Sequence, residues 1–272
     1  MSRSGILTLL TDFGTRDSYV GVMKGAIAQV NPCLTVIDLT HDVPPQNIAH
    51  ARFALMSAVP YFPRGTVHIA VVDPGVGSDR RGVAIAFGDS ATQPTGFLVG
   101  PDNGLFSGVL AQYPVLAAVE LTNPQYWRES QPSSTFHGRD IFAPVGAHLA
   151  SGISLEVIGS AIAPDTLTSF PLPLLTRQNH SILGCIQAID HFGNLITNIH
   201  SNDVADFAWA VQIADLSIDR VTAYRDRPSS SPLALIGSHG WVEIAINCGN
   251  AQQMLNLHIG DPIQIVLEQR KE

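Results

Sequence analysis

Apolar residues in the first part of the chain alternate between short continuous runs and segments with helical spacing. The runs are typical of buried strands, and residues such as Met23, Ile27 and Val30 recur at the spacing of an amphipathic helix. The pattern predicts strands at 5–10, 34–39, 65–73, 82–87 and 96–100, and helices at 19–30, 47–62, 101–113 and 140–152. Alternating strands and helices favour an α/β fold, in which a mostly parallel sheet is flanked by helices.

The pattern changes near residue 170. The segment 169–181 is rich in proline and polar residues, and helical spacing is scarce beyond it. Apolar runs separated by turn residues predict strands at 182–190, 207–218, 232–237, 241–247 and 261–268. We therefore expect an N-terminal α/β domain over 1–170, a linker over 171–181 and a smaller, barrel-like all-β domain over 182–272.

Composition narrows the range of partners. Hydrophobic residues make up 45% of the 272 residues and charged residues 14%, which is typical of a chain with a large core. The formal net charge is −8, so we expect no nucleic-acid partner, because phosphate binding needs a concentrated basic face. Apolar runs are too short to predict a membrane span. Isolated cysteines and an N-terminus that looks like a strand, not a signal peptide, favour a cytoplasmic protein.

Polar residues gather at the ends of the predicted strands. Asp12, Asp38, Asp73 and Asp102 all lie there, and the carboxyl ends of strands are where open α/β sheets bind ligands. The sequence lacks the glycine patterns of dinucleotide folds and P-loops, the serine elbow of hydrolases, and metal-ligand spacing. It therefore predicts a polar site at this sheet edge without a metal ion.

The loop 71–82, with the sequence VVDPGVGSDRRG, places Asp73 near Arg80 and Arg81. An aspartate before Pro-Gly is often a turn residue that bonds its own backbone, so Asp73 alone has a structural interpretation too. Two glycines in the same loop let the backbone approach another group closely, which favours a site. His137, between Phe136 and Gly138, can likewise be structural or catalytic, and a lone histidine is more often structural. The presence of these loops together favours a functional site.

Six strings along the chain carry a resemblance to a known family. They are, in order, LLTDFGTRDSYVGVMKG, VVDPGVGSDRRG, GPDNGLF, STFHGRDIFAPVGAHLA, IDHFGNLITNI and GSHGWVEIAIN. They resemble the S-adenosylmethionine (SAM) hydroxide adenosyltransferases, relatives of fluorinase and chlorinase. The resemblance implies hydrolysis of SAM to adenosine and methionine by attack of an activated water on ribose C5′. It also implies a homotrimer with sites at subunit interfaces, and neither metal nor cofactor, since SAM is the substrate.

The resemblance assigns the activation of water to Asp73, Arg80 and His137. It assigns substrate binding to Asp12, Asp190, Asn194, Ser238, Glu243, Ile246 and Cys248. Asp12 would hold the ribose hydroxyls, and the backbone near the last two residues would hold adenine. The chain departs from the halogenating relatives at His239, where they carry an arginine, which leaves the contact to the methionine carboxylate open.

Three other functions remain to be weighed at this point. A non-catalytic adenosine or SAM sensor could use the same pocket, although it would gain nothing from a water-activating trio. A halide-using transferase is disfavoured because the acid at Asp73 would repel a halide ion. A metal-dependent hydrolase built on scattered Asp and His residues is the third. Spacing favours Arg80 over Arg81 as the arginine that points inward.

Overall fold

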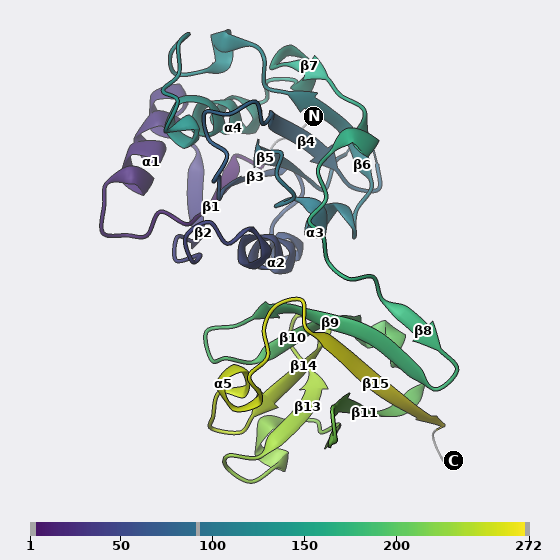
Figure 1. Ribbon diagram of the computed structural model, residues 1–272. Helices are drawn as coiled ribbons and strands as arrows, with labels where there is room; N and C mark the ends of the chain where they lie inside the picture. The colour runs from purple at the N-terminus through teal and green to yellow at the C-terminus, as the bar shows by residue number, and fades with distance from the viewer. Residues whose placement is uncertain (1–3, 91–92, 270–272) are drawn as a thin grey trace. The chain divides into compact units, whose positions relative to one another are not determined.

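Figure 1 shows a computed structural model of the protein, which describes residues 4–90 and 93–269. The chain divides into two compact units, Met1–Phe170 and Pro171–Glu272. The first unit combines helices with a sheet of mostly parallel strands, and the second is an antiparallel, nearly closed barrel. The predicted fold class is confirmed.

The first unit is built on a seven-stranded sheet with the order β2-β1-β3-β5-β4-β6-β7. Its strands are β1 (Ile6–Thr11), β2 (Thr35–Thr40), β3 (Thr66–Val71), β4 (Gly82–Phe87), β5 (Gly96–Pro101), β6 (Val115–Glu120) and β7 (Ser160–Ala161). β4 and β7 run opposite to the other strands. The central strands β3, β4 and β5 are buried along almost their whole length, as expected of strands covered on both faces.

Two groups of helices cover this sheet. The helices are α1 (Tyr19–Val30), α2 (Ile48–Ala58), α3 (Ser107–Leu110) and α4 (Ala143–Ala150), and a π-helical turn at Gly138–Phe142 precedes α4. α1 packs against α4, and Met23 and Ile27 share a core with Leu7 and Ile69 of the sheet. α2 packs against α3 and β1 (Figure 1). All four predicted helices are present, although α3 is shorter than the predicted segment 101–113.

The pairing of β1 with β3 positions two residues of the predicted site. These strands are parallel neighbours with Thr11 opposite Val71, so the loops that follow them leave from the same edge of the sheet. Asp12 comes directly after β1, and Asp73 comes two residues after β3. The strand ends therefore bring both carboxylates to one side of the unit.

The second unit has the strand order β12-β11-β15-β9-β10-β14-β13, and β8 pairs with β9. Its elements are β8 (Thr176–Gln178), β9 (Ser181–Ile189), β10 (Leu195–His200), β11 (Phe207–Ile213), β12 (Leu216–Asp219), β13 (Pro232–Ile236), β14 (Trp241–Ile246), α5 (Ala251–Leu255) and β15 (Pro262–Gln269). Arg220, after β12, bridges to Ala234 in β13, so the two ends of the sheet approach each other. Alternate residues such as Ile182 and Ile186 fill the interior.

Several local predictions differ from the structure. Segment 207–218, predicted as one strand, is a hairpin, because Ala214 turns the chain with a φ of 48°. The predicted linker 171–181 contains β8, which pairs with β9. β6, β7 and β10 lie where the pattern predicts no strand. The short helix α5 lies within the predicted all-β region, and the Asn250 side chain caps it by accepting from the Gln253 N–H.

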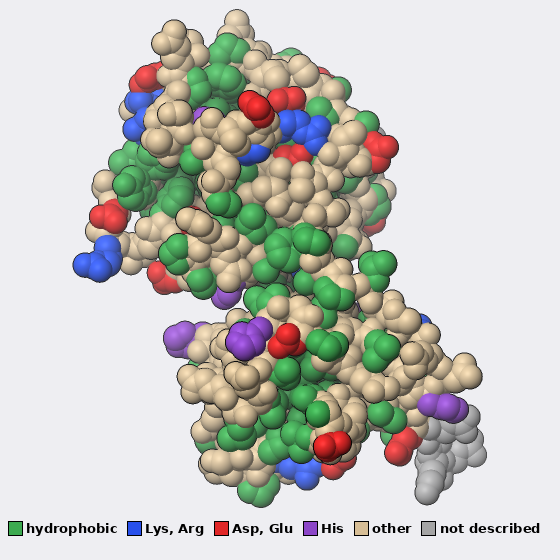
Figure 2. All heavy atoms as spheres, viewed as in Figure 1, with side chains coloured by type: hydrophobic (Ala, Val, Ile, Leu, Met, Phe, Trp, Pro, Cys, Tyr) green, Lys and Arg blue, Asp and Glu red, His purple; other side chains and the backbone are tan. Residues whose placement is uncertain are grey.

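Charged side chains lie singly or in small groups over the face drawn in Figure 2. Within residues 4–90 and 93–269, every helix is too short or too polar to cross a membrane. Short 3-10 turns complete the units at Val59–Tyr61, Pro124–Tyr126, Leu155–Val157, Pro164–Thr166, Ser201–Asp203 and Tyr224–Asp226.

Candidate active site

A cavity of about 450 Å³ opens at the ends of β1 and β3 in the first unit. Its walls include Asp12, Phe13, Gln46, Asp73, Phe136 and His137. Aromatic and aliphatic side chains make up much of the wall, with two carboxylates and one imidazole among them. Such a cavity suits a small organic molecule that has a flat apolar part and a few polar groups.

Asp73 is bound by Arg80 within the loop between β3 and β4. Arg80 Nε lies 2.9 Å from Oδ1 and 3.0 Å from Oδ2, and Nη2 also donates to Oδ2. The two side chains are 5% and 11% exposed, so this ion pair is largely shielded from water. Paired donors from one guanidinium fix the plane of a carboxylate as well as its charge. Asp73 thus reaches the cavity wall in a defined orientation.

Glycine lets this loop approach the opposite wall of the cavity. Gly77 has a φ of 79°, and a Cβ there would lie 2.4 Å from the carbonyl oxygen of Ser134. Another residue type would therefore push the two loops apart. This is the close backbone approach that the sequence predicts for the Gly-Val-Gly segment.

His137 contacts the same arginine. Its Nδ1 lies 2.7 Å from Arg80 Nη2. Because a guanidinium has donors and no acceptor, Nδ1 must accept, and the ring proton resides on Nε2. Burial lowers the pKa of His137, and the Arg80 charge lowers it further, against opposite effects of Asp73 and Asp140. The imidazole is therefore neutral at neutral pH and presents an N–H donor.

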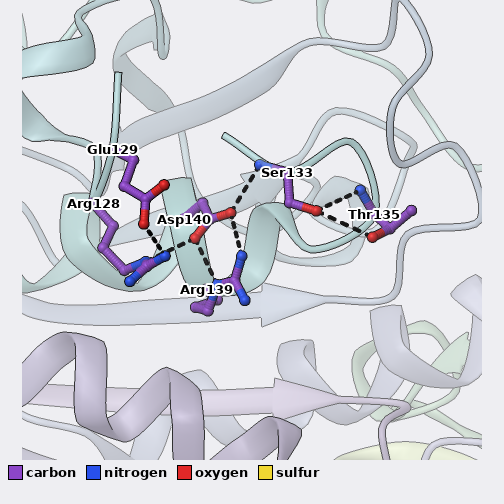
Figure 3. Close-up of polar contacts among 6 residues, drawn as sticks. All are labelled: Arg128, Glu129, Ser133, Thr135, Arg139 and Asp140. Carbon is purple, nitrogen blue, oxygen red and sulfur yellow. Dashed lines mark hydrogen bonds and ion pairs between the residues drawn. The ribbon is translucent and has the colours of Figure 1, made fainter. Parts of the chain in front are cut away.

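A second buried carboxylate holds the loop that carries His137 (Figure 3). Asp140 is 1% exposed and accepts from Arg128 Nε at 2.9 Å, Arg139 Nε at 2.6 Å and the Ser133 N–H at 2.9 Å. Burial opposes its charge, but these hydrogen bonds, led by that of Arg139, lower the pKa of Asp140 well below its usual range. The Ser133 hydroxyl in turn contacts the hydroxyl and the N–H of Thr135. Asp140 therefore holds, through Ser133, the segment 135–137 that forms part of the cavity wall. The sequence analysis missed this role of Asp140.

Asp12 lines the cavity, and one of its two carboxylate oxygens accepts a hydrogen bond from the protein itself. Oδ2 accepts from the backbone N–H of Gln46 at 2.7 Å. Gln46 adopts a φ of 65°, a strained conformation for a residue with a side chain, which aims that N–H at Asp12. Among the residues that the structure describes, no donor reaches Oδ1. This oxygen can accept from a ligand.

Arg81 points away from the Asp73 cluster. Its Nε donates to Asp102 Oδ2 at 3.0 Å, and its Nη1 donates to the Thr166 hydroxyl at 3.1 Å. Asp102 also accepts from the Thr168 N–H at 2.8 Å. Arg81 therefore joins the end of β5 to the segment after β7. Arg80, in contrast, is the arginine that binds Asp73 at the cavity wall.

Two of the predicted substrate-binding residues in the second unit stabilise their own hairpin. Asp190 Oδ1 accepts from the N–H groups of Phe192 and Asn194, each at 2.9 Å. Asp190 Oδ2 accepts from the Asn194 side chain at 2.9 Å. These bonds build the turn between β9 and β10, as Asx turns do. Among residues 4–90 and 93–269 no second donor to Oδ2 is seen, so this oxygen can also accept from a ligand.

The other predicted residues of the second unit gather around β14. Glu243 is 3% exposed; its Oε1 accepts from the Tyr224 hydroxyl at 2.6 Å, and His239 Nε2 lies 3.2 Å from its Oε2. Burial, followed by the nearby Glu243, raises the pKa of Tyr224. Ile246 is buried at the end of β14, while Ser238 and Cys248 are exposed, the latter with a φ of 56°. The structure thus brings Glu243 together with His239, the residue at which the sequence analysis leaves a substrate contact open.

No metal centre is evident in the described part of the chain. The residues there contain no group of three or more His, Cys, Asp or Glu side chains arranged to hold a metal ion. The polar groups at the cavity are instead two carboxylates, a neutral imidazole and, behind them, a guanidinium. Such a set binds and orients by hydrogen bonds and can move a proton.

The fold and this cluster define a class of protein: an α/β unit with a polar cavity at its parallel strand ends, followed by a β barrel. The family model of the SAM hydroxide adenosyltransferase N-terminal domain matches residues 7–159, and that of the C-terminal domain matches residues 184–264. The chain therefore belongs to the SAM hydroxide adenosyltransferase family, and the resemblance noted in the sequence is confirmed.

Individual relatives agree with this assignment. The chain is similar to the (R)-S-adenosyl-L-methionine hydrolases of Salinispora tropica, with 39% identity over 95% of this chain and 97% of the relative, and of Salinispora arenicola, with 37% identity over 97% and 99%. A crystal structure of an uncharacterized conserved protein from Thermotoga maritima superposes with a TM-score of 0.86 and 34% identity, covering 96% of this chain and 99% of that one. Relatives named fluorinase are 27–29% identical.

Proposed function

We propose that this protein hydrolyses SAM to adenosine and methionine. Curated relatives that share more than a third of its residues over nearly the full chain carry the name of this hydrolase. The observation in the structure that carries the proposal is the Asp73–Arg80–His137 cluster, in which Asp73 and His137 line the cavity and Arg80 binds both. A halide-using enzyme or a sensor has no need of a carboxylate aimed at a nucleophile.

The reaction places its chemical demand on the nucleophile. The water oxygen bonds to ribose C5′ while the C5′–S bond breaks, and the bonding electron pair leaves on sulfur as the neutral thioether of methionine. One proton of the attacking water is released. Because the sulfonium is already activated, no general acid is needed at the leaving group, and neither a metal ion nor a cofactor has a role. Positioning and deprotonation of water supply the catalysis.

The hydrogen-bond directions divide the work within the cluster. His137 presents Nε2–H and so donates to the water oxygen, which leaves Asp73 as the group that accepts the water proton. Arg80 lies behind both, fixing the carboxylate plane and the imidazole tautomer. We assign Asp73 as the base, His137 as the donor that orients the water, and Arg80 as the cation that holds them. This divides among the three residues the activation of water that the resemblance assigns to them together.

Asp12 is assigned to the ribose hydroxyls. A carboxylate can accept from both vicinal hydroxyls, and Oδ1 faces no other donor among the described residues. Fixing the sugar aligns C5′ with the water, and alignment of reacting atoms can lower a barrier by several kcal/mol, with roughly 7–11 kcal/mol as the upper range.

The remaining residues of the proposed substrate site belong to the second unit. They are Asp190, Asn194, Ser238, Glu243, Ile246 and Cys248. We propose that they act on the adenine and methionine parts in a cytoplasmic homotrimer, where the second unit of one subunit faces the first unit of its neighbour. The buried Glu243 carboxylate, which accepts from the exposed Tyr224, and the second lone pair on Asp190 Oδ2 would give this side of the substrate site a negative potential, which suits a cationic substrate.

The test is incubation of the purified protein with SAM, followed by chromatography. Equal amounts of adenosine and methionine are expected, and added fluoride or chloride should yield no 5′-halogenated nucleoside. Adenosine binding without turnover would contradict the proposal in favour of a sensor. A halogenated product would assign the protein to the halide-using enzymes.

A further inference from the structure

The loop that carries Asp12 is tied to a chain of side chains beneath the cavity. Thr11, fully buried at the end of β1, has its hydroxyl 2.8 Å from His41 Nδ1. His41 is 5% exposed, and its Nε2 lies 3.1 Å from Asp38 Oδ1. Lys24 of α1 donates to the other oxygen of Asp38 at 2.6 Å. Four side chains from β1, β2, the loop after β2 and α1 thus form one connected line.

The direction of each hydrogen bond follows from its donors. Lys24 and His41 lower the pKa of Asp38, although burial opposes them, so Asp38 is ionised. His41 Nε2 lies 3.1 Å from Asp38 Oδ1 in an ion-pair contact without hydrogen-bond geometry, and the negative charge of Asp38 favours the ring proton on Nε2. In the neutral ring this leaves Nδ1 as the acceptor for the Thr11 hydroxyl. The Thr11 oxygen then remains to accept from the Phe13 N–H, 3.2 Å away. The line ends at the backbone on the far side of Asp12.

Residues 41–46, which follow β2, hold the loop around Asp12 at two further points. The His41 carbonyl accepts from the Gly14 N–H at 2.8 Å, and the Gln46 N–H donates to Asp12 Oδ2 at 2.7 Å. The Thr11 side chain before Asp12, the Gly14 backbone after it and one oxygen of the Asp12 carboxylate are therefore all bonded to residues 41–46. The direction in which Oδ1 points depends on where His41 lies.

We propose that His41, held by Asp38, is a positioning residue that sets the Asp12 carboxylate for the ribose hydroxyls of the nucleoside. The inference rests on the proposed function, since it concerns the same cavity. His41 touches neither the cavity wall nor the reacting atoms, and it acts through Thr11 and the loop 11–14. The proposal predicts that removing one of the contacts among Thr11, His41 and Asp38 weakens the recognition of the ribose hydroxyls more than the recognition of the base.

The structure supplies a matched control on the same strand. Thr8 of β1 has its hydroxyl 2.8 Å from His68 Nδ1, and both residues are buried. This pair has the same chemistry as Thr11–His41 but belongs to the centre of the sheet, away from the cavity. Thr8→Val and Thr11→Val remove the same hydroxyl from the same kind of contact. A loss of stability is common to both, and a loss of ribose recognition is specific to the second.

The experiment measures the affinities of adenosine and 2′,3′-dideoxyadenosine by calorimetry, together with SAM hydrolysis. Their affinity ratio reports recognition of the ribose hydroxyls. In Thr11→Val the ratio should fall about tenfold, the value of one well-formed hydrogen bond, with dideoxyadenosine affinity nearly unchanged. Thr8→Val should keep the wild-type ratio, and Thr11→Ser, which restores the hydroxyl, should recover it.

Asp38→Asn is the second variant, because its partly exposed side chain makes misfolding a small risk. It should lower the ratio in the same direction as Thr11→Val. Equal ratios in wild type, Thr11→Val and Asp38→Asn would overturn the inference, as would an equal fall in Thr8→Val. Failure of the wild type to hydrolyse SAM would instead contradict the proposed function, so the two failures are distinguishable.

Discussion

Asp73 and Asp140 are two carboxylates whose side chains are largely shielded from water, and both are bound by arginine, yet their surroundings differ. Asp73 is bound by one guanidinium that also contacts an imidazole, and it lines the cavity. Asp140 accepts from two guanidinium groups and a backbone N–H and lies behind the wall. In the proposed mechanism the first cluster leaves a base and a donor facing the substrate, while the second uses its hydrogen bonds to hold the chain. Under that proposal, identical residue types serve chemistry at one position and scaffold at the other.

Replacing Asp73 by asparagine should produce the largest effect. The amide keeps the volume but cannot take a proton, so kcat for SAM hydrolysis should fall by about 10²–10⁴-fold, the usual contribution of a positioned base. Adenosine affinity, measured by calorimetry, should stay close to that of the wild type. A variant with wild-type kcat would show that Asp73 is not the base.

Replacing Asp140 by asparagine should act on stability first. It leaves Arg128 and Arg139 without their shared counter-charge, and we expect a loss of about 2 kcal/mol in the free energy of unfolding, because both arginines are partly exposed and can turn to water. Chemical denaturation measures this loss. At a temperature where the variant is folded, it should retain far more activity than Asp73→Asn. The reverse order of activities would remove the distinction between the two clusters.

The neighbouring arginines of the β3–β4 loop offer a smaller and sharper comparison. Arg80→Lys keeps the charge but loses the fork that binds Asp73 and His137, so turnover should drop by about tenfold. Arg81→Lys alters the pair with Asp102, away from the cavity, and turnover should stay within about twofold of the wild type. Initial rates with saturating SAM measure both. Equal losses would mean that both arginines serve the cavity.

The smallest effect is electrostatic. Burial and the Arg80 charge lower the pKa of His137, so activity should persist as pH falls below the usual histidine range and should decline once the imidazole gains a proton. The Asp140 charge raises this pKa, so Asp140→Asn should lower it further and move the acidic limb of the kcat profile to lower pH. NMR titration of the His137 ring tests the sign. A pKa that rises in Asp140→Asn would contradict the electrostatic assignment.

The fold was predictable where one periodicity dominates a segment. Buried strands such as Thr66–Val71 and amphipathic helices such as Tyr19–Val30 follow from local pattern alone. β6 and β7 escaped prediction because their pairing, with residues far away in the chain, makes them strands. The five-residue helix α5 is too short for periodicity to register, and it forms where Asn250 caps it.

The candidate site was predictable in part. Asp73 and Arg80 share one loop, so their spacing was enough to suggest contact. His137 lies 57 residues beyond Arg80, and only the family resemblance joined them before the structure did. The anchoring role of Asp140 and the line from Thr11 through His41 to Asp38 arise from packing between elements. No local sequence signal reports them.

The most direct test of the Asp73 cluster is hydrolysis of SAM in water enriched in heavy oxygen, with mass spectrometry of the adenosine formed. Attack of a cluster-bound water on C5′ predicts one heavy oxygen in the 5′-hydroxyl of every adenosine made by the wild type, at a rate that collapses in Asp73→Asn. Adenosine without the label, or labelled adenosine formed equally fast by Asp73→Asn, would contradict the assignment of Asp73 as the base that activates water.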